Sequence, residues 1–277
     1  MPLPLPTPLV AFESLRLSFE AMDDVALPDF AGSAWRGACG RALRDLSCVR
    51  ACVSPNQCPM PTMCAYRYLF ETPLPPNAGK MRLYERVPHT FVIDPRGTEG
   101  AHSRGETISL VVVVVGRAAG WAGNVVRAFA HAGEKGIGSG RGRLRLIGVE
   151  HQDPPGGDVW LPADPLTPQT LATPAPAPPC PAAVRVRLLT PLRLKEDGHN
   201  VTPDQFQPHH LLRNVLRRIS LLTYFHTDTP YETDFAALTA QARDVQPRAA
   251  ELTWRDWKRY SSRQQTPLAM GGLIGTF

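Results

Sequence analysis

The segment best suited to chemistry is GEKGIGSGRGRLRL, residues 133–146, where glycines are interleaved with other residues and arginines follow. Glycine lets backbone amides approach a phosphate closely, and arginine supplies charge-assisted hydrogen bonds. The segment joins a predicted helix to a predicted strand and lacks a Gly-Lys-Ser/Thr end, so neither a dinucleotide fingerprint nor a P-loop fits. We expect either a flexible connector or a phosphate-contacting loop. The contacts of such a loop would come from Gly136, Gly138, Gly140, Arg141, Arg143 and Arg145.

Arginine pairs recur along other predicted elements. The chain has 30 basic residues, of which only Lys80, Lys135, Lys195 and Lys258 are lysines. A GC-rich genome would produce this bias by itself, although the planar guanidinium also suits phosphates and base edges. The pairs that share a strand face or a helix face are Arg185 with Arg187, Arg213 with Arg217, and Arg259 with Arg263. Each pair alone is typical of a solvated surface, but their repetition favours a basic surface for nucleic acid.

Four cysteines form a cluster after the first predicted helix. Cys48, Cys52, Cys58 and Cys64 are separated by three, five and five residues, whereas Cys39 and Cys180 look unrelated. In a reducing compartment such a cluster favours a metal over disulfides, but zinc sites usually contain two close pairs. A structural zinc and a set of free thiols therefore both remain open.

The histidines show no catalytic signature. All eight are scattered, neither HExxH nor GxSxG occurs, and no paired carboxylates are evident. His209 and His210 come just before a predicted arginine-bearing helix, and we expect them to be exposed and structural.

Length and composition limit the class of protein. With 277 residues, 43% of them hydrophobic, the chain is long enough for one large or two modest domains. The longest aliphatic run, Leu110 to Val115, is too short to cross a membrane, and the start MPLPLPTPLV has no basic region typical of a signal peptide. We expect a cytoplasmic protein. Its net charge of +5 is mild for this length.

A proline-rich connector divides the chain. Residues 151–183 contain ten of the 29 prolines, which fix φ and remove backbone donors. The predicted domains are residues 1–150, with the cysteine cluster and the glycine-rich segment, and residues 184–277. Between them, residues 151–183 form the linker.

Periodicity predicts related folds for the two parts. In the first, the order is strand, helix, two strands, helix and strand, which is the pattern of a ferredoxin-like (RRM-like) domain. The ranges are 15–19, 30–46, 91–93, 108–115, 118–131 and 144–146. In the second, a strand at 184–188, a helix at 208–224 and strands at 257–264 and 269–277 follow the same order and then stop. We therefore expect an α+β protein with two tandem ferredoxin-like domains, the second incomplete at its C-terminus.

Four segments in this order resemble a known family. They are FAGSAWRGACGRALRDLSC, the cysteine cluster ending CAYRYLFETP, the segment GEKGIGSGRGRLRL, and WRDWKRYSSRQQTPLAMGGLIG. Together they are similar to the RAMP endoribonucleases that process precursor CRISPR RNA. The resemblance implies two tandem ferredoxin-like domains that hold a repeat RNA stem-loop. It also implies metal-independent cleavage, in which the ribose 2′-OH attacks the adjacent phosphorus and leaves a 2′,3′-cyclic phosphate.

The sequence departs from this family where a catalytic histidine is usual. Many members place one in or near the first helix, whereas this chain has none between Met1 and Pro88. Arginine is a poor general base, but it can position the 2′-OH and stabilise the phosphorane. We therefore expect Arg36 and Arg41 near the scissile phosphate, with His102 assisting. Arg44 would contact the RNA backbone.

Three functions remain in competition at this point. The leading one is a CRISPR RNA-processing endoribonuclease that keeps the mature guide RNA. The second is a non-cleaving RAMP-type subunit that binds guide RNA beside other subunits of a CRISPR effector complex, which the missing histidine favours. The third is a zinc-stabilised protein–protein adaptor.

Overall fold

The computed structural model describes residues 12–48, 58, 63–81, 86–152, 155–160, 181–261 and 266–277. These residues divide into two compact units. Unit 1 comprises residues 1–174 with Leu221–Pro230, and unit 2 comprises residues 175–220 with Tyr231–Phe277. None of the helices in the described ranges is long and apolar enough to span a membrane.

Unit 1 is built on an antiparallel sheet with the strand order β3-β5-β1-β6-β7. Its strands are β1 (Phe12–Ala21), β3 (Phe91–Asp94), β5 (Thr107–Val115), β6 (Leu144–Gln152) and β7 (Pro155–Trp160). Taken by their place in the chain, the first four strands lie in the order second, third, first, fourth. With one helix after β1 and one after β5, this is the βαββαβ ferredoxin-like arrangement, so the prediction for the first half is confirmed.

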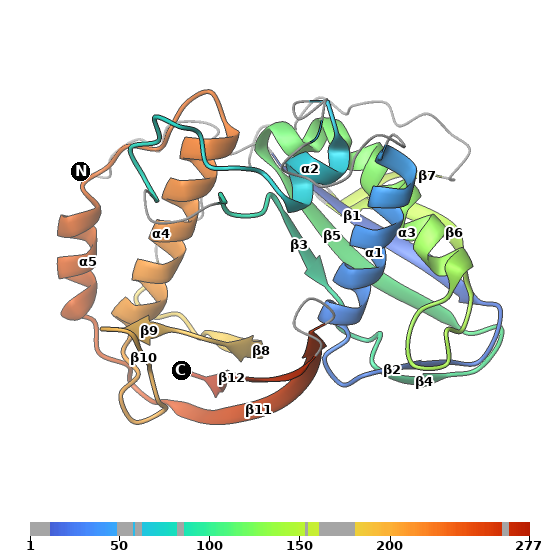
Figure 1. Ribbon diagram of the computed structural model, residues 1–277. Coiled ribbons are helices and arrows are strands. Elements are labelled where there is room, and N and C mark those ends of the chain that lie inside the picture. Colours follow the sequence, from blue (N-terminus) through green and yellow to red (C-terminus); the bar gives the residue numbers. More distant parts are fainter. Residues whose placement is uncertain are drawn as a thin grey trace. The chain divides into compact units, whose positions relative to one another are not determined.

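Two helices cover one face of this sheet (Figure 1). They are α1 (Gly32–Ser47) and α3 (Ala122–Lys135), and the latter is preceded by the 3-10 turn η2 (Gly116–Trp121). Leu15, Leu17 and Phe19 alternate with less buried neighbours along β1 and point into the core, as their period of two predicts. Trp35 of α1 and Phe129 of α3 are fully buried there, with ring centroids 6.1 Å apart.

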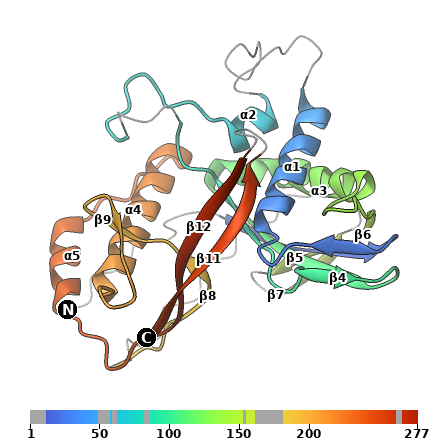
Figure 2. The same cartoon turned by 60° about the horizontal axis from the view of Figure 1, so that its bottom comes forward.

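A second, smaller strand pair lies beside the main sheet of unit 1 (Figure 2). Strand β2 (Val25–Leu27) runs antiparallel to β4 (Gly100–His102), and Val25 is opposite His102. Neither strand was predicted, because three residues are too few to show a period.

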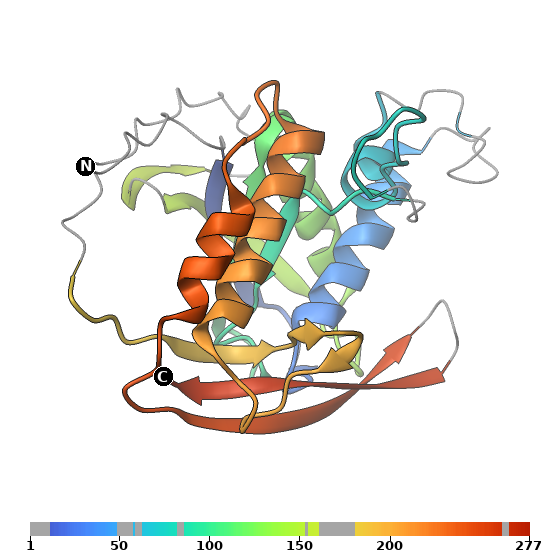
Figure 3. The same cartoon turned by 90° about the vertical axis from the view of Figure 1, so that its left-hand side faces the viewer.

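Unit 2 contains a three-stranded antiparallel sheet in the order β11-β12-β8 (Figure 3). These strands are β8 (Arg187–Leu192), β11 (Glu251–Ser261) and β12 (Thr266–Thr276). A short hairpin after β8 consists of β9 (Lys195–Glu196) and β10 (His199–Asn200). Numbered by their order in the chain, the three strands lie in the order second, third, first, which is also the order of the first three strands in the main sheet of unit 1. Its small core contains Leu194, Val201, Phe206 and Leu273.

The helices of unit 2 are α4 (Pro208–His226) and α5 (Phe235–Arg243), but the end of α4 belongs to unit 1. Leu221 and Phe225 form a cluster with Val87. Arg117 donates to the carbonyl oxygen of Phe225 at 2.9 Å and to Asp228 at 2.8 Å. Since the sequence patterns of α4 are uniform along its length, only these tertiary contacts reveal that its end packs in unit 1.

The first part of the predicted linker forms strands instead of an extended connector. Residues 151 and 152 complete β6, and β7 pairs with β6 in the part that was expected to be an extended connector. β7 begins with Pro155, which a sheet tolerates at an edge strand because the missing N–H faces away from the ladder. Residues 161–180 lie outside the described residues, so the linker and the domain ranges stay predictions.

Candidate functional site

The glycine-rich segment forms a tight turn against β2. We call residues 136–142 the glycine loop. The amide of Ile137 donates to the carbonyl of Gly142 at 2.9 Å, and the amide of Ser139 donates to that of Ala26 at 3.4 Å. Gly138 has φ +81°, and a Cβ there would lie 2.1 Å from the carbonyl oxygen of Ala26. The glycines of this loop therefore allow it to pack against the protein's own backbone. The prediction of a phosphate-contacting loop did not include this role.

The three arginines of the loop and the following strand differ in their partners. Arg143 makes a two-pronged ion pair with Asp23, at 2.8 and 3.0 Å, and its hydrogen bonds lower the pKa of Asp23 to about 2. Arg145 pairs with Glu20 on β1. Arg141 is exposed with φ +52°, and its side chain has no hydrogen-bond or ion-pair partner within the described ranges. Its charge is thus the most available of the three to an anion.

His102 ends β4 in a fixed orientation. Its Nε2 lies 3.0 Å from the carbonyl oxygen of Thr98, and because a carbonyl can only accept, Nε2 carries the proton. The lone pair is then on Nδ1, which lies 3.6 Å from a carboxylate oxygen of Glu106. The hydroxyl of Thr98 accepts from the indole of Trp35 at 3.0 Å, which links the segment before β4 to α1. A proton taken up at Nδ1 would therefore form an ion pair with Glu106.

The structure brings His102 and the glycine loop to the same short strand. β2 pairs with β4 through Val25 and His102, and the loop contacts β2 through Ala26. An imidazole with a free lone pair and an unpartnered arginine thus belong to elements that both contact β2.

The predicted arginines of α1 are placed in three ways. The guanidinium of Arg36 lies over the rings of Phe91 and Phe70, at 4.7 and 5.0 Å from their centroids, which are cation–π contacts. Arg41 is exposed next to Gly37, and Arg44 is exposed in the last turn of the helix. The catalytic roles of Arg36 and Arg41 and the RNA-binding role of Arg44 stay predictions.

The predicted arginines of unit 2 are mostly at its surface. Arg185, Arg187 and Arg217 are exposed, and Arg185 precedes the strand β8, in which Arg187 lies. Arg213 is tied down, since it donates to Glu196 at 3.3 Å and to the carbonyl of Lys195 at 2.9 Å. Arg259 lies in β11, and Arg263 falls outside the described residues.

The cysteine cluster straddles a region that is largely outside the described residues. Cys48 caps the end of α1, Cys64 precedes the short helix α2 (Ala65–Phe70), and Cys58 is half-buried. Cys52 lies outside the described residues. Within the described ranges, Cys48, Cys58 and Cys64 do not converge as a three-ligand group. A structural zinc at these four positions stays a prediction.

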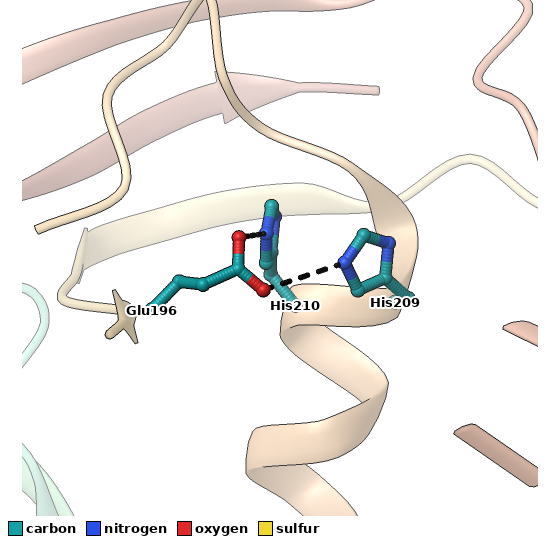
Figure 4. Close-up of side chains that lie close together, drawn as sticks. All are labelled: Glu196, His209 and His210. Atoms are coloured by element: carbon teal, nitrogen blue, oxygen red, sulfur yellow. Dashed lines mark hydrogen bonds and ion pairs between the residues drawn. The ribbon is translucent and has the colours of Figure 1, made fainter. Parts of the chain in front are cut away.

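Glu196, His209 and His210 form a cluster in unit 2 that the sequence did not predict (Figure 4). Glu196 of β9 accepts from Nε2 of His210 at 3.0 Å, and Nε2 of His209 lies 3.9 Å from its other oxygen. The expectation that both histidines are exposed was wrong, because their side chains are only 14% and 3% exposed, for His209 and His210 respectively. Burial lowers the pKa of His209, and the hydrogen bond from His210 lowers that of Glu196.

These three side chains are close enough to hold a metal ion, but their hydrogen bonds oppose it. Nδ1 of His210 accepts from the amide of Gln207 at 3.0 Å, so the imidazole proton is on Nε2 and no lone pair remains there for a metal. Arg213 also lies 3.3 Å from Glu196 and would repel a cation. We therefore interpret the cluster as a structural link between β9 and the start of α4.

Two family models match separate parts of the chain. A family model described as an N-terminal domain matches residues 8–172, and the model for the CRISPR-associated endoribonuclease Cas6 matches residues 186–277. No curated protein matches the chain.

Two solved structures are also similar. A Cas6 product complex has 19% identity and a TM-score of 0.46, covering 96% of this chain and 84% of that one. A RAMP protein binding different RNA substrates has 12% identity and a TM-score of 0.39, covering 96% and 86%. The family models and the α+β fold of two sheet-containing units agree with the resemblance found in the sequence. In its C-terminal third, residues 186–277, the chain is similar to the CRISPR-associated endoribonuclease Cas6 family.

Proposed function

We propose that this chain cleaves CRISPR repeat RNA without a metal ion, by attack of a ribose 2′-OH on the adjacent phosphorus. The P–O5′ bond breaks as the O2′–P bond forms, so the products are a 2′,3′-cyclic phosphate and a 5′-hydroxyl. The observation that carries this proposal is His102, whose Nδ1 carries the lone pair and lies 3.6 Å from Glu106, in a chain whose residues 186–277 match the Cas6 family model. The mature guide RNA would remain bound to the protein.

His102 acts in this scheme as the general base. Its Nδ1 accepts the proton of the 2′-OH, while the Nε2–H bond to Thr98 holds the ring in place. Glu106, at 3.6 Å, stabilises the imidazolium that results. The leaving 5′-oxygen takes its proton from water, and the phosphorane needs positive charge, which Arg36 and Arg41 would supply. In this scheme His102 is the main catalytic residue, whereas the sequence-based prediction gave that role to Arg36 and Arg41 of α1.

RNA binding should depend on Arg141 more than on Arg143. Arg141→Ala removes an unpartnered charge, so we expect the slope of log affinity against log salt to flatten by about 0.7–0.9. Arg143→Ala should change the slope less, because Asp23 already compensates that charge. Asp23→Asn, which releases Arg143, should instead strengthen binding. Fluorescence anisotropy of a labelled repeat across a salt series measures all three, and equal slopes in Arg141→Ala and wild type would exclude Arg141 from the interface.

The decisive experiment for the function is single-turnover cleavage of a labelled repeat in the presence of a chelator. We expect cleavage to proceed and the 5′ fragment to end in a 2′,3′-cyclic phosphate. Tight binding with no cleavage, with or without added magnesium, would make the chain a non-cleaving RNA-binding subunit. Cleavage that needs magnesium would instead contradict the metal-independent mechanism.

A further inference from the structure

Unit 2 contains a hollow of about 450 Å³ that none of the roles above uses. It lies just after β8, at the end of the β9–β10 hairpin, and where β11 pairs with β12. Its lining residues are Arg193, Asn200, Thr202, Trp254, Asp256, Met270 and Gly271. The hollow therefore joins one aromatic ring, one acid, one base and one amide.

The aromatic part of the lining is held rigidly. Trp254 packs partly against the core of unit 2, and its indole N–H donates to Oδ1 of Asp256 at 2.7 Å. Asp256 is opposite Gly271 across the β11–β12 ladder. A Cβ at Gly271 would lie 2.5 Å from both the indole nitrogen and Oδ1 of Asp256, so the missing side chain leaves room for this pair. The indole is thus a fixed surface on which a flat ring could stack.

The polar part of the lining keeps unused hydrogen-bonding capacity. Arg193 donates from Nε to the carbonyl of Gly271 at 3.0 Å, which holds the guanidinium beside the hollow. Within the described ranges, its terminal nitrogens, Oδ2 of Asp256 and the amide of Asn200 have no partner. Arg193 and Asp256 line the same hollow without forming an ion pair within 4.0 Å. A ligand that offers both a donor edge and an acceptor edge would complement them.

We propose that this hollow binds one unpaired guanine of an RNA, stacked on Trp254. A carboxylate accepts from the N1–H and the 2-amino group of guanine, and arginine donates to O6 and N7. Unpaired RNA bases are commonly read on these edges while they stack on aromatic side chains. Adenine offers neither the N1–H nor O6, so it does not fit the pair. The inference deepens the proposed function, on which it rests for the nature of the ligand.

Binding of guanosine 5′-monophosphate to the full chain, measured by calorimetry, tests the hollow without any repeat RNA. We expect binding to wild type and, for inosine and adenosine monophosphates, a dissociation constant at least about 10-fold higher. Asp256→Asn keeps an oxygen for the indole N–H but replaces Oδ2 with a donor, so the preference for guanine should vanish. Arg193→Lys keeps the charge but lacks the fork, and it should weaken guanine binding by a similar factor.

Asp244→Asn, an exposed acid at the end of α5, is the matched control and should bind like wild type. Equal affinity of wild type for the three nucleotides, no binding at all, or an unchanged preference in Asp256→Asn would each overturn the guanine assignment. Melting curves of each variant verify folding. Since cleavage of the repeat is measured separately, a failure of this hollow and a failure of the proposed nuclease are distinguishable.

Discussion

His102→Gln is expected to slow single-turnover cleavage of the repeat by about 100- to 10,000-fold, the usual contribution of a general base. Glutamine reaches about as far as histidine Nε2 and can still donate to the carbonyl of Thr98, so the β2–β4 strand pair should keep its fold. It has no lone pair at the position of Nδ1 that could take up a proton. Repeat affinity should change far less than the rate, since proton transfer contributes only in the transition state.

The matched control for this variant is His131→Gln. His131 of α3 also has a glutamate near its Nδ1, Glu134 at 3.8 Å, so it resembles the arrangement of His102 and Glu106. Its loss should leave the cleavage rate unchanged. Equal rates for wild type and His102→Gln would remove His102 from the mechanism and return attention to Arg36 and Arg41.

Gly138→Ala should destabilise unit 1 by about 2–3 kcal/mol, which is large for a single methyl group. The substitution forces φ +81° on a residue with a Cβ and places that atom 2.1 Å from the carbonyl oxygen of Ala26. The loop must then leave β2 or shift the β2–β4 strand pair, so the repeat cleavage rate should fall as well. Urea unfolding followed by circular dichroism measures the first effect.

Gly140→Ala provides the comparison for Gly138→Ala in the same loop. A Cβ at Gly140 meets nothing within 4 Å, so this change should cost less than about 0.5 kcal/mol. If Gly138→Ala unfolds at the same urea concentration as Gly140→Ala, the loop does not pack on β2 as described.

The main sheet of unit 1 was predictable because its strands carry a clear period. Leu15, Leu17 and Phe19 alternate along β1, and β5 with a run of valines reads as a buried strand. β8 was placed too early, since Val184 is 71% exposed and the strand begins at Arg187. A lone alternating triplet does not distinguish the edge of a strand from the segment that leads to it.

The site was less predictable because its key contacts join distant parts of the chain. The glycines of the glycine loop indicated an unusual backbone conformation. The sequence did not indicate that Arg143 forms an ion pair with Asp23, which lies 120 residues earlier in the chain. The sequence predicted His102 only as an assisting residue, whereas its orientation depends on Thr98 and Glu106. His209 and His210 likewise contact Glu196, whose short strand has no sequence signature.

The central claim, that the 2′-OH of the repeat itself is the nucleophile, is tested most directly with a single 2′-deoxy substitution at the scissile nucleotide. The substituted repeat should bind with unchanged affinity, because one hydroxyl among many contacts is lost. It should not be cleaved at that position, because the attacking atom is absent. Cleavage of the 2′-deoxy repeat at the same bond and a similar rate would contradict the mechanism, since the nucleophile would then have to be water or another group.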